Sequence, residues 1–240
     1  MARVADREAG VTIRVVTYNV HKCRGVDGRT TATRIAEVLR EINPDIAALQ
    51  EVLDHQAEVI AREVGLALVM GENRKHLGYA YGNAVLSRLP IRESRNYDLS
   101  VRGREARGCL RADIEWNQSS VLHVFNVHLG TSFLERREQA RRLVTAELLN
   151  DLTIESPRIV LGDFNEWSRG LTTRLLRSHL ESADIRKHLN RSRTYPGLLP
   201  LLHLDHIYYD QDLKLERLTL VRTRKTLVAS DHLPLAAEFA

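Results

Sequence analysis

Short apolar runs rich in β-branched residues recur along the whole chain, and they constrain the fold more than any other feature of the sequence. We predict ten strands from them: Thr12–Tyr18, Ile46–Leu49, Ala67–Met70, Ala80–Leu86, Leu110–Ile114, Val121–Val127, Arg158–Leu161, Leu204–Tyr209, Leu215–Val221 and Leu235–Phe239. Four helical segments lie between them, at residues 32–42, 53–64, 133–150 and 171–180. Many strands with a few interspersed helices predict packed sheets covered by helices, in one layered α/β domain.

Two of the predicted helices have a clear pattern. The first carries apolar residues at helical spacing (Ala32, Ile35, Ala36, Leu39 and Ile42) and is stopped by Asn43-Pro44. The helix over 133–150 turns Ala140, Leu143, Val144 and Leu148 inward. Its Arg136, Arg137, Arg141 and Arg142 are interpreted as a solvated face, supported by Glu138 four residues before Arg142.

Polar residues that can bind metal or phosphate stand where the apolar runs end or begin. They are Asn19, Gln50 and Glu51, Asn126 and His128, Asp163 and Asn165, and Asp231 and His232, with Asp205 beside a further apolar stretch. Metal binding through oxygen ligands and phosphoryl transfer both need carboxylates, amides and imidazoles gathered at one edge of a sheet. The pattern therefore predicts a site for metal binding or phosphoryl transfer at one edge of a sheet.

Each of these residues also has a structural interpretation. Glu51 fits the first turn of a helix, and Asp163 with Asn165 fits an Asx-turn. His128 fits a buried core histidine, and Asp231 fits a cap. Turns and caps do not explain why all of them stand at successive strand ends. The sequence has no G-x-S-x-G, no H-E-x-x-H, no Walker A motif and no zinc-type cysteine cluster.

Six segments, taken in order, resemble the motif series of the endonuclease/exonuclease/phosphatase superfamily. They are Thr17-Tyr18-Asn19, Leu49-Gln50-Glu51-Val52, Asn126-Val127-His128, Gly162-Asp163-Phe164-Asn165, Leu204-Asp205-His206-Ile207 and Ser230-Asp231-His232. The superfamily includes pancreatic-type deoxyribonucleases, AP endonucleases, inositol-polyphosphate 5-phosphatases and bacterial sphingomyelinases. The resemblance runs from about residue 12 to the C-terminus. It implies a four-layer α/β/β/α sandwich, two packed and mainly antiparallel sheets flanked by helices, with the site at one end of the sheets.

The resemblance also implies a metal site. Glu51 matches the main ligand of a divalent cation, Mg²⁺ or Mn²⁺, and carboxylate oxygens suit these hard ions. Asp231 matches the second carboxylate near the metal. Asn19 is placed to support the ligand, to contact the metal or to touch the phosphate.

The catalytic roles are carried over in the same way. Asp163 matches the residue that orients and deprotonates the attacking water, and Asn165 the one that holds the transition-state oxygens. His232 matches the histidine that contacts the scissile phosphate, and Asp205 the carboxylate that fixes its tautomer. His128 matches a second histidine, either a phosphate contact or the leaving-group acid. AP endonucleases mostly lack this histidine, which makes AP-site cleavage a less favoured activity.

A second group of candidate residues lies outside the six motif segments. Arg107, Arg191, Arg193 and Tyr195 are candidates for substrate contact. Glu72 is a candidate to orient His128, and Lys22 and Cys23 are candidates for the rim of the site. The apolar run Leu198–Leu202 either contacts a bilayer or packs inward.

Composition narrows the substrate without naming it. Lys+Arg number 35 against 31 Asp+Glu, and the net charge of +4 allows an anionic partner without requiring nucleic acid. With Trp 2, Tyr 7 and Phe 4, few aromatic side chains are left to stack single-stranded bases. A chain of 240 residues has little room for recognition insertions, so a small-molecule phosphatase or phosphodiesterase fits best. A phospholipid head group, a nuclease acting on DNA or RNA, and a non-catalytic phosphate-binding module with the same fold remain open.

The remaining expectations concern organisation and compartment. We expect a flexible N-terminus over residues 1–10 and a single catalytic domain over 11–240. Cys23 and Cys109 show no metal-type spacing and are expected to be free thiols in a reducing compartment. No apolar run is long enough for a transmembrane helix, and we predict a cytoplasmic protein of open oligomeric state.

Overall fold

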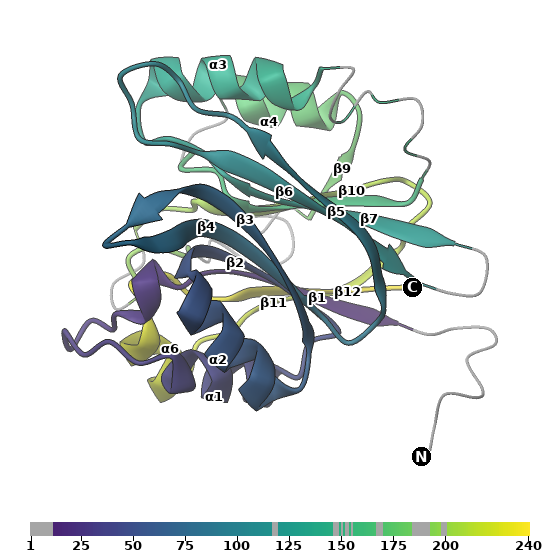
Figure 1. Ribbon diagram of the computed structural model, residues 1–240. Helices are drawn as coiled ribbons and strands as arrows, with labels where there is room; N and C mark the ends of the chain where they lie inside the picture. Colours follow the sequence, from purple (N-terminus) through teal and green to yellow (C-terminus); the bar gives the residue numbers. More distant parts are fainter. Residues whose placement is uncertain are drawn as a thin grey trace.

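Two six-stranded sheets pack face to face, and helices cover both outer faces (Figure 1). The computed structural model describes residues 12–116, 120–145, 149, 151, 154, 156–166, 170–183, 193–197 and 201–240. The first sheet has the order β11 (Leu215–Leu220), β12 (Leu235–Phe239), β1 (Ile13–Asn19), β2 (Ile46–Leu53), β4 (Tyr79–Ser87), β3 (Ala67–His76). The second has the order β5 (Ile91–Asp98), β6 (Gly108–Glu115), β7 (Val121–His128), β8 (Arg158–Asp163), β10 (Asp205–Tyr209), β9 (Glu181–Ser182).

Within the described part of the chain, three longer helices and three shorter ones lie outside the sheets. On the first sheet are η1 (His21–Cys23), α1 (Ala32–Ile42), α2 (Asp54–Val64) and α6 (Arg224–Ala229), and on the second are α3 (Phe133–Leu143) and α4 (Leu171–Arg177). The four layers of Figure 1 are thus helix, sheet, sheet and helix. The predicted α/β/β/α sandwich is confirmed.

The two sheets share one pairing pattern. In each sheet the central pair is parallel, β1 with β2 and β7 with β8, and every other described pair is antiparallel. Asn19 at the end of β1 donates to Asp163 at the end of β8, so the parallel pairs of both sheets end at the same end of the sandwich.

Strand alternation sorts the apolar side chains into three cores. Along β1, Ile13 and Val15 pack between the sheets, whereas Val16 and Tyr18 pack under the helices. The same alternation on β7, β8 and β10 fills the core between the sheets and a third core under α3 and α4. Both faces of the central strands are buried, which explains why these strands stand out in the sequence as nearly continuous apolar runs.

Two strands were missed, and both are edges of the second sheet. β5 exposes most of its side chains and buries Tyr97, and β9 has two residues. An edge strand with a solvated face lacks the apolar signal that identified the others. β3 also continues six residues beyond the predicted Met70, as the polar arm of a hairpin with β4.

Helices are present at the four predicted places, but the ones predicted over 133–150 and 171–180 are shorter than expected, and the short η1 and α6 were not predicted. The α1 helix has the predicted bounds, and Asn43 ends it in a left-handed conformation. The α3 helix stops at Leu143, because the chain turns there and Leu149 donates its backbone N–H to the Leu143 carbonyl. Leu148, predicted to point inward, lies outside the described residues.

One arginine of α3 departs from the predicted solvated face. Arg136 is buried and donates to the carbonyls of Gly130 and Thr131, so it holds the loop that enters the helix. Arg137 and Arg141 are exposed, and the predicted pair of Glu138 with Arg142 is present.

Three further expectations bear on the chain as a whole. Cys23 and Cys109 are both buried and free, as predicted. The stretch expected to be a flexible N-terminus, residues 1–10, lies outside the described residues. Within the described residues, no helix has the length and apolar character needed to cross a membrane.

Candidate active site

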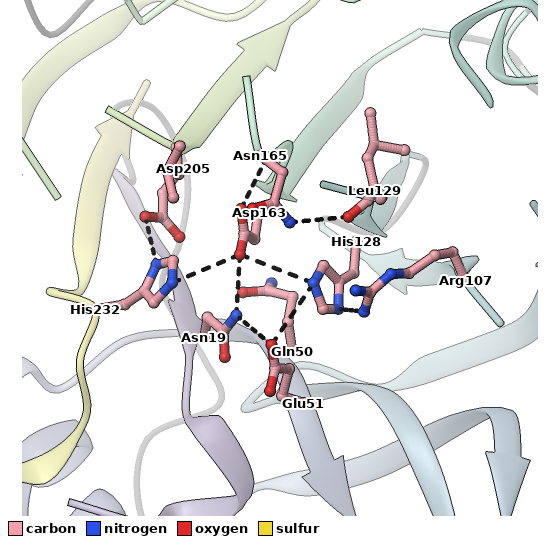
Figure 2. A network of polar contacts seen from close by, with 12 residues as sticks. Asn19, Gln50, Glu51, Arg107, His128, Leu129, Asp163, Asn165, Asp205 and His232 are labelled. Atoms are coloured by element: carbon pink, nitrogen blue, oxygen red, sulfur yellow. Dashed lines mark hydrogen bonds and ion pairs between the residues drawn. The ribbon is translucent and has the colours of Figure 1, made fainter. Parts of the chain in front are cut away.

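Four of the expected site residues lie at the ends of strands, on the strand face that points between the two sheets (Figure 2). Asn19 ends β1, His128 ends β7, Asp163 ends β8 and Asp205 begins β10. Each lies an even number of residues from apolar neighbours of its own strand that fill the inter-sheet core. Strand alternation therefore directs all four side chains toward the gap between the sheets.

Glu51 reaches the same place through a bulge in β2. Ala47 and Leu49 face the helices, so regular alternation would turn Glu51 toward the helices as well. The register with β4 shifts between Leu49 and Val52, and Glu51 has a left-handed backbone with φ of 56°. The shift turns Glu51 toward Asn19 and returns Val52 to the helix side. The interpretation of Glu51 as a helix first-turn residue is therefore wrong.

A glycine fixes the spacing of the two strands that carry His128 and Asp163. Those two residues are register partners across the parallel pair β7–β8. Gly162, directly before Asp163, has φ of 148°, and a Cβ there would stand 1.9 Å from the Val127 carbonyl oxygen. Any side chain at position 162 would push β8 away from β7 and so separate the pair.

Asn19 joins the two carboxylates that face it. Its Nδ2 donates to Glu51 Oε1 at 3.2 Å and to Asp163 Oδ2 at 2.9 Å, and its Oδ1 accepts from the backbone N–H of His21. The backbone N–H of Asn165 donates to Asp163 Oδ1 at 2.9 Å, so the Asx-turn is present. This turn leaves Asp163 Oδ2 directed into the site.

Two histidines face Asp163 from opposite sides. His128 Nε2 lies 3.8 Å from Asp163 Oδ2, and His232 Nε2 lies 3.7 Å from the same oxygen (Figure 2). His128 Nε2 is also 3.8 Å from Glu51 Oε1. The network thus links residues from both sheets around a single carboxylate oxygen.

His232 is held as a cation. Its Nδ1 is 3.0 Å from Asp205 Oδ2, as the predicted carboxylate partner requires. Burial opposes the charge of His232, but the facing carboxylates of Asp205 and Asp163 outweigh it and raise its pKa to about 10. At neutral pH the site therefore contains an imidazolium beside Asp163.

His128 has a different partner and a different charge. Arg107 Nη1 lies 3.1 Å from His128 Nδ1, and a guanidinium can only donate, so Nδ1 accepts and the ring hydrogen lies on Nε2. Burial and Arg107 lower the pKa of His128 to about 4, against the opposing effect of Asp163 and Glu51. His128 is therefore neutral at neutral pH, and its buried Nε2 has no hydrogen-bond partner among the described residues.

The two acidic groups differ as well. Burial disfavours the charge of Glu51, but His128, the hydrogen bond from Asn19 and Lys22 lower its pKa to about 2. Burial raises the pKa of Asp163; His232 acts in the opposite direction, and Asp205 adds to the rise. Glu51 is thus a stable anion, and Asp163 has the greater affinity for a proton.

Behind the site, a buried polar contact joins the sheets. Gln50 Nε2 donates to Asn126 Oδ1 at 2.8 Å, and Asn126 Nδ2 donates to the carbonyls of Leu49 and Ala84. Both side chains are fully buried. The sequence analysis grouped both residues with those able to bind metal or phosphate, but their side chains instead bond to each other and to the backbone.

The structure gives the positions of several candidates that lie outside the motif segments. Arg107, predicted for substrate contact, lies behind His128 and is buried. Glu72 does not orient His128: it is exposed and pairs with Lys75. Lys22 lies at the rim, with Nζ 3.6 Å from Glu51 Oε2, whereas Cys23 is buried away from it.

Other predicted residues lie at the edge of the network. Asp231 Oδ1 is 3.5 Å from His21 Nδ1 and 3.3 Å from Ser230 Oγ. The ring of Tyr195 is half-buried and packs 4.8 Å, centroid to centroid, from that of His232. Arg193 is exposed, and Arg191 lies outside the described residues.

The donor set fits a divalent cation that has few protein ligands. Among the described residues, no three His, Cys, Asp or Glu side chains form a ready-made metal cluster. Mg²⁺ is usually held by one or two carboxylates and keeps several waters, so such a cluster is not required. Glu51 carries a stable negative charge, and its Oε2 faces the ammonium of Lys22 at 3.6 Å. A carboxylate of this kind suits a hard cation.

Comparison with known proteins agrees with the fold and the motifs. The sequence model of the Endonuclease/Exonuclease/phosphatase family matches residues 16–232. The uncharacterised protein YbhP of Escherichia coli K12 is 32% identical over 251 residues, covering 97% of this chain and 98% of YbhP.

Solved structures of low sequence identity share the fold. A functionally unknown conserved protein from Enterococcus faecalis V583 has a TM-score of 0.81 at 20% identity and covers 95% of this chain and 99% of its own. A mannosyl-6-phosphatase of Bacteroides thetaiotaomicron has a TM-score of 0.80 at 18% identity, with the same coverage of 95% and 99%.

Proposed function

The chain belongs to the endonuclease/exonuclease/phosphatase family, and on this premise we propose that it hydrolyses phosphate esters with the help of Mg²⁺ or Mn²⁺. The observation that carries the proposal is the surroundings of Asp163 Oδ2. This oxygen accepts from Asn19 and has a histidine nitrogen on either side of it. Such an arrangement suits the activation of a water next to an anionic substrate. We further propose that residues 11–240 form one catalytic domain that acts in the cytoplasm.

Glu51 and Asp231 are the residues we propose to hold the cation. Asn19 supports Glu51, because its Nδ2 faces that carboxylate while its oxygen accepts from the backbone of His21. A bound divalent cation would withdraw negative charge from the phosphate oxygens and so favour attack on phosphorus.

Asp163 is the proposed general base. The attacking water transfers a proton to Asp163 Oδ2 while its oxygen forms a bond to phosphorus. The ester P–O bond breaks, its electron pair leaves with the ester oxygen, and that oxygen takes a proton from solvent. Burial and Asp205 raise the proton affinity of Asp163, which favours this transfer. The backbone N–H of Asn165 holds the other oxygen of the carboxylate, so the base keeps one orientation.

The two histidines take different parts in holding the phosphate. His232, as an imidazolium, offsets negative charge on the phosphate oxygens. His128 donates its Nε2 hydrogen as a neutral ring, and with a pKa of about 4 it suits phosphate contact better than proton transfer to the leaving group. Asn165 Nδ2 donates to the Leu129 carbonyl and keeps a second hydrogen for a transition-state oxygen.

The test combines an activity screen with direct measurement of metal binding. The purified chain is assayed on bis-p-nitrophenyl phosphate, p-nitrophenyl phosphate, phospholipids, inositol phosphates and plasmid DNA, with Mg²⁺, with Mn²⁺ and with chelator. We expect hydrolysis that requires the metal. Titration calorimetry should show Mn²⁺ binding that Glu51→Gln weakens and that the exposed control Glu216→Gln leaves unchanged. If the chain binds no metal and hydrolyses no ester, the proposal is wrong and the non-catalytic binding module is favoured.

A further inference from the structure

The tip of the β3–β4 hairpin combines two unfavourable features in one residue. The turn has two residues, Leu77 and Gly78, and both have positive φ, at 50° and 86°. This is the pattern of a type I′ turn, in which asparagine or glycine is preferred at the first position. Leu77 occupies that position with 85% of its surface exposed. A leucine with a strained backbone and an exposed side chain does not stabilise the fold, so its presence indicates a binding partner.

The hairpin extends from the catalytic end of the sandwich. Tyr81 of β4 pairs with Leu53, two residues beyond Glu51, and Lys22 lies 5.7 Å from the centre of the Tyr81 ring. The strands then continue outward to Tyr79, itself 49% exposed. In Figure 1 the hairpin projects on the side opposite the C-terminus.

The other exposed apolar side chains belong to segments of the same end. Phe133 and Leu134, 60% and 70% exposed, open α3 five residues after His128. Val26 lies just after η1, and its backbone N–H donates to the carbonyl of Val228, three residues before Asp231.

Leu201, four residues before Asp205, is also exposed. The exposed large apolar side chains of the described residues are thus all found on segments that lead into or out of the site. Of the run Leu198–Leu202 that we considered for bilayer contact, residues 198–200 lie outside the described part.

Unpaired arginines accompany these apolar residues. Arg24 and Arg29 lie beside Val26, Arg102 and Arg104 lie in the loop before Gly108, and Arg137 follows Leu134. All five are exposed, and no ion pair is found for them within the described ranges. The acidic neighbours are already paired, Asp27 with Arg34 and Glu105 with Arg74 and Arg107. The rim therefore presents apolar side chains together with free positive charge.

We propose that the catalytic end docks on an anionic phospholipid surface and that the substrate is a phosphate ester of a phospholipid. The statement about the substrate rests on the proposed function. Leucines and valines that enter the headgroup region, flanked by arginines, match the amphiphilic character of such a surface. A nucleic acid would match the charge, but of these exposed apolar side chains only Tyr79 and Phe133 carry a ring on which bases could stack, and the others are aliphatic.

The decisive variant is Leu77→Asn. Asparagine accepts positive φ, so this change should raise the melting temperature while it removes an apolar contact with the lipid. Binding to vesicles of phosphatidylcholine mixed with phosphatidylglycerol, measured by co-sedimentation, should weaken about tenfold. Opposite shifts in stability and binding cannot come from misfolding.

A charge pair of variants tests the arginines. Arg104→Glu should weaken vesicle binding, whereas Arg62→Glu should not. Arg62 lies at the far end of α2, is exposed and has no ion pair with any described residue. Binding of the unaltered chain should fall as salt rises and should be weak on phosphatidylcholine alone.

Three results would overturn the docking surface: no binding of the unaltered chain to anionic vesicles, unchanged binding by Leu77→Asn, or binding to duplex DNA without binding to vesicles. Hydrolysis of a soluble ester without vesicle binding would leave the proposed function intact and remove this inference. Vesicle binding without hydrolysis of any ester would keep the docking surface and remove the catalytic proposal together with its substrate class.

Discussion

His128 and His232 lie on either side of Asp163, with Nε2 at 3.8 Å and 3.7 Å from the same oxygen. Both are buried, yet the pKa of one is about 4 and that of the other about 10. The difference comes from the group at the opposite ring nitrogen, a guanidinium for His128 and a carboxylate for His232. The partner behind an imidazole thus decides whether it acts as a neutral donor or as a cation.

Removing the carboxylate that the two histidines share should have the largest effect. Asp163→Asn keeps the shape of the site and removes the proposed base, and kcat should fall about a thousandfold. Steady-state kinetics on the ester identified by the screen measure this. The exposed Asp212→Asn serves as the matched control, and near-normal turnover of a folded, metal-loaded Asp163→Asn would contradict the role of Asp163.

The next variant removes the carboxylate behind His232, so that His232, like His128, has no negative group at its Nδ1. Asp205→Asn removes the negative charge behind His232, so its pKa should fall from about 10 toward the ordinary value. We expect kcat to fall about a hundredfold because the imidazolium is lost. An NMR titration of the His232 ring follows the pKa, and an unchanged pKa would show that Asp205 does not control the charge.

The converse variant removes the guanidinium behind His128, so that His128, like His232, has no positive group at its Nδ1. Arg107→Met removes a positive charge and the donor to Nδ1, so the pKa of His128 should rise from about 4. We expect kcat to fall about tenfold because the ring loses its fixed tautomer. Arg107→Lys keeps a charged donor and should preserve more of the activity; equal losses in the two variants would contradict the role of Arg107 as a donor.

The last prediction concerns stability and not turnover. The folded pKa of His232 is raised above its unfolded value of about 6.5, so its contribution is complete below that pH and is lost as the pH rises toward 10. His232→Gln should therefore cost about 2 kcal/mol at pH 6 and progressively less at higher pH. Urea unfolding from pH 6 to pH 10 measures the difference, and a constant or growing cost would contradict the raised pKa.

The fold was largely predictable because most strands are buried on both faces. Their apolar runs identify them, and motif order gave the sandwich. β5 could not be found in this way because its side chains are mostly solvated, and the turn after Leu143 could not be found because a helical pattern continues past it.

For the site, the identities of Glu51, Asp163 and His232 follow from their motifs, but their surroundings do not. Strand alternation alone would have turned Glu51 the wrong way, since the bulge has no signal in the side-chain pattern. The partner of His128 was also missed, because Arg107 lies 21 residues away and meets it through the pairing of β6 with β7.

The contact of Gln50 with Asn126 has a consequence for how such a protein can diversify. It joins the sheet that carries Asn19 and Glu51 to the sheet that carries His128 and Asp163. An interface made of apolar side chains alone would permit the two sheets to slide along each other. Any displacement of one sheet along the other would leave buried amides without partners, which is costly. The spacing of the reacting groups is therefore inherited as a unit, and new substrates must be accommodated by changes in the surrounding loops.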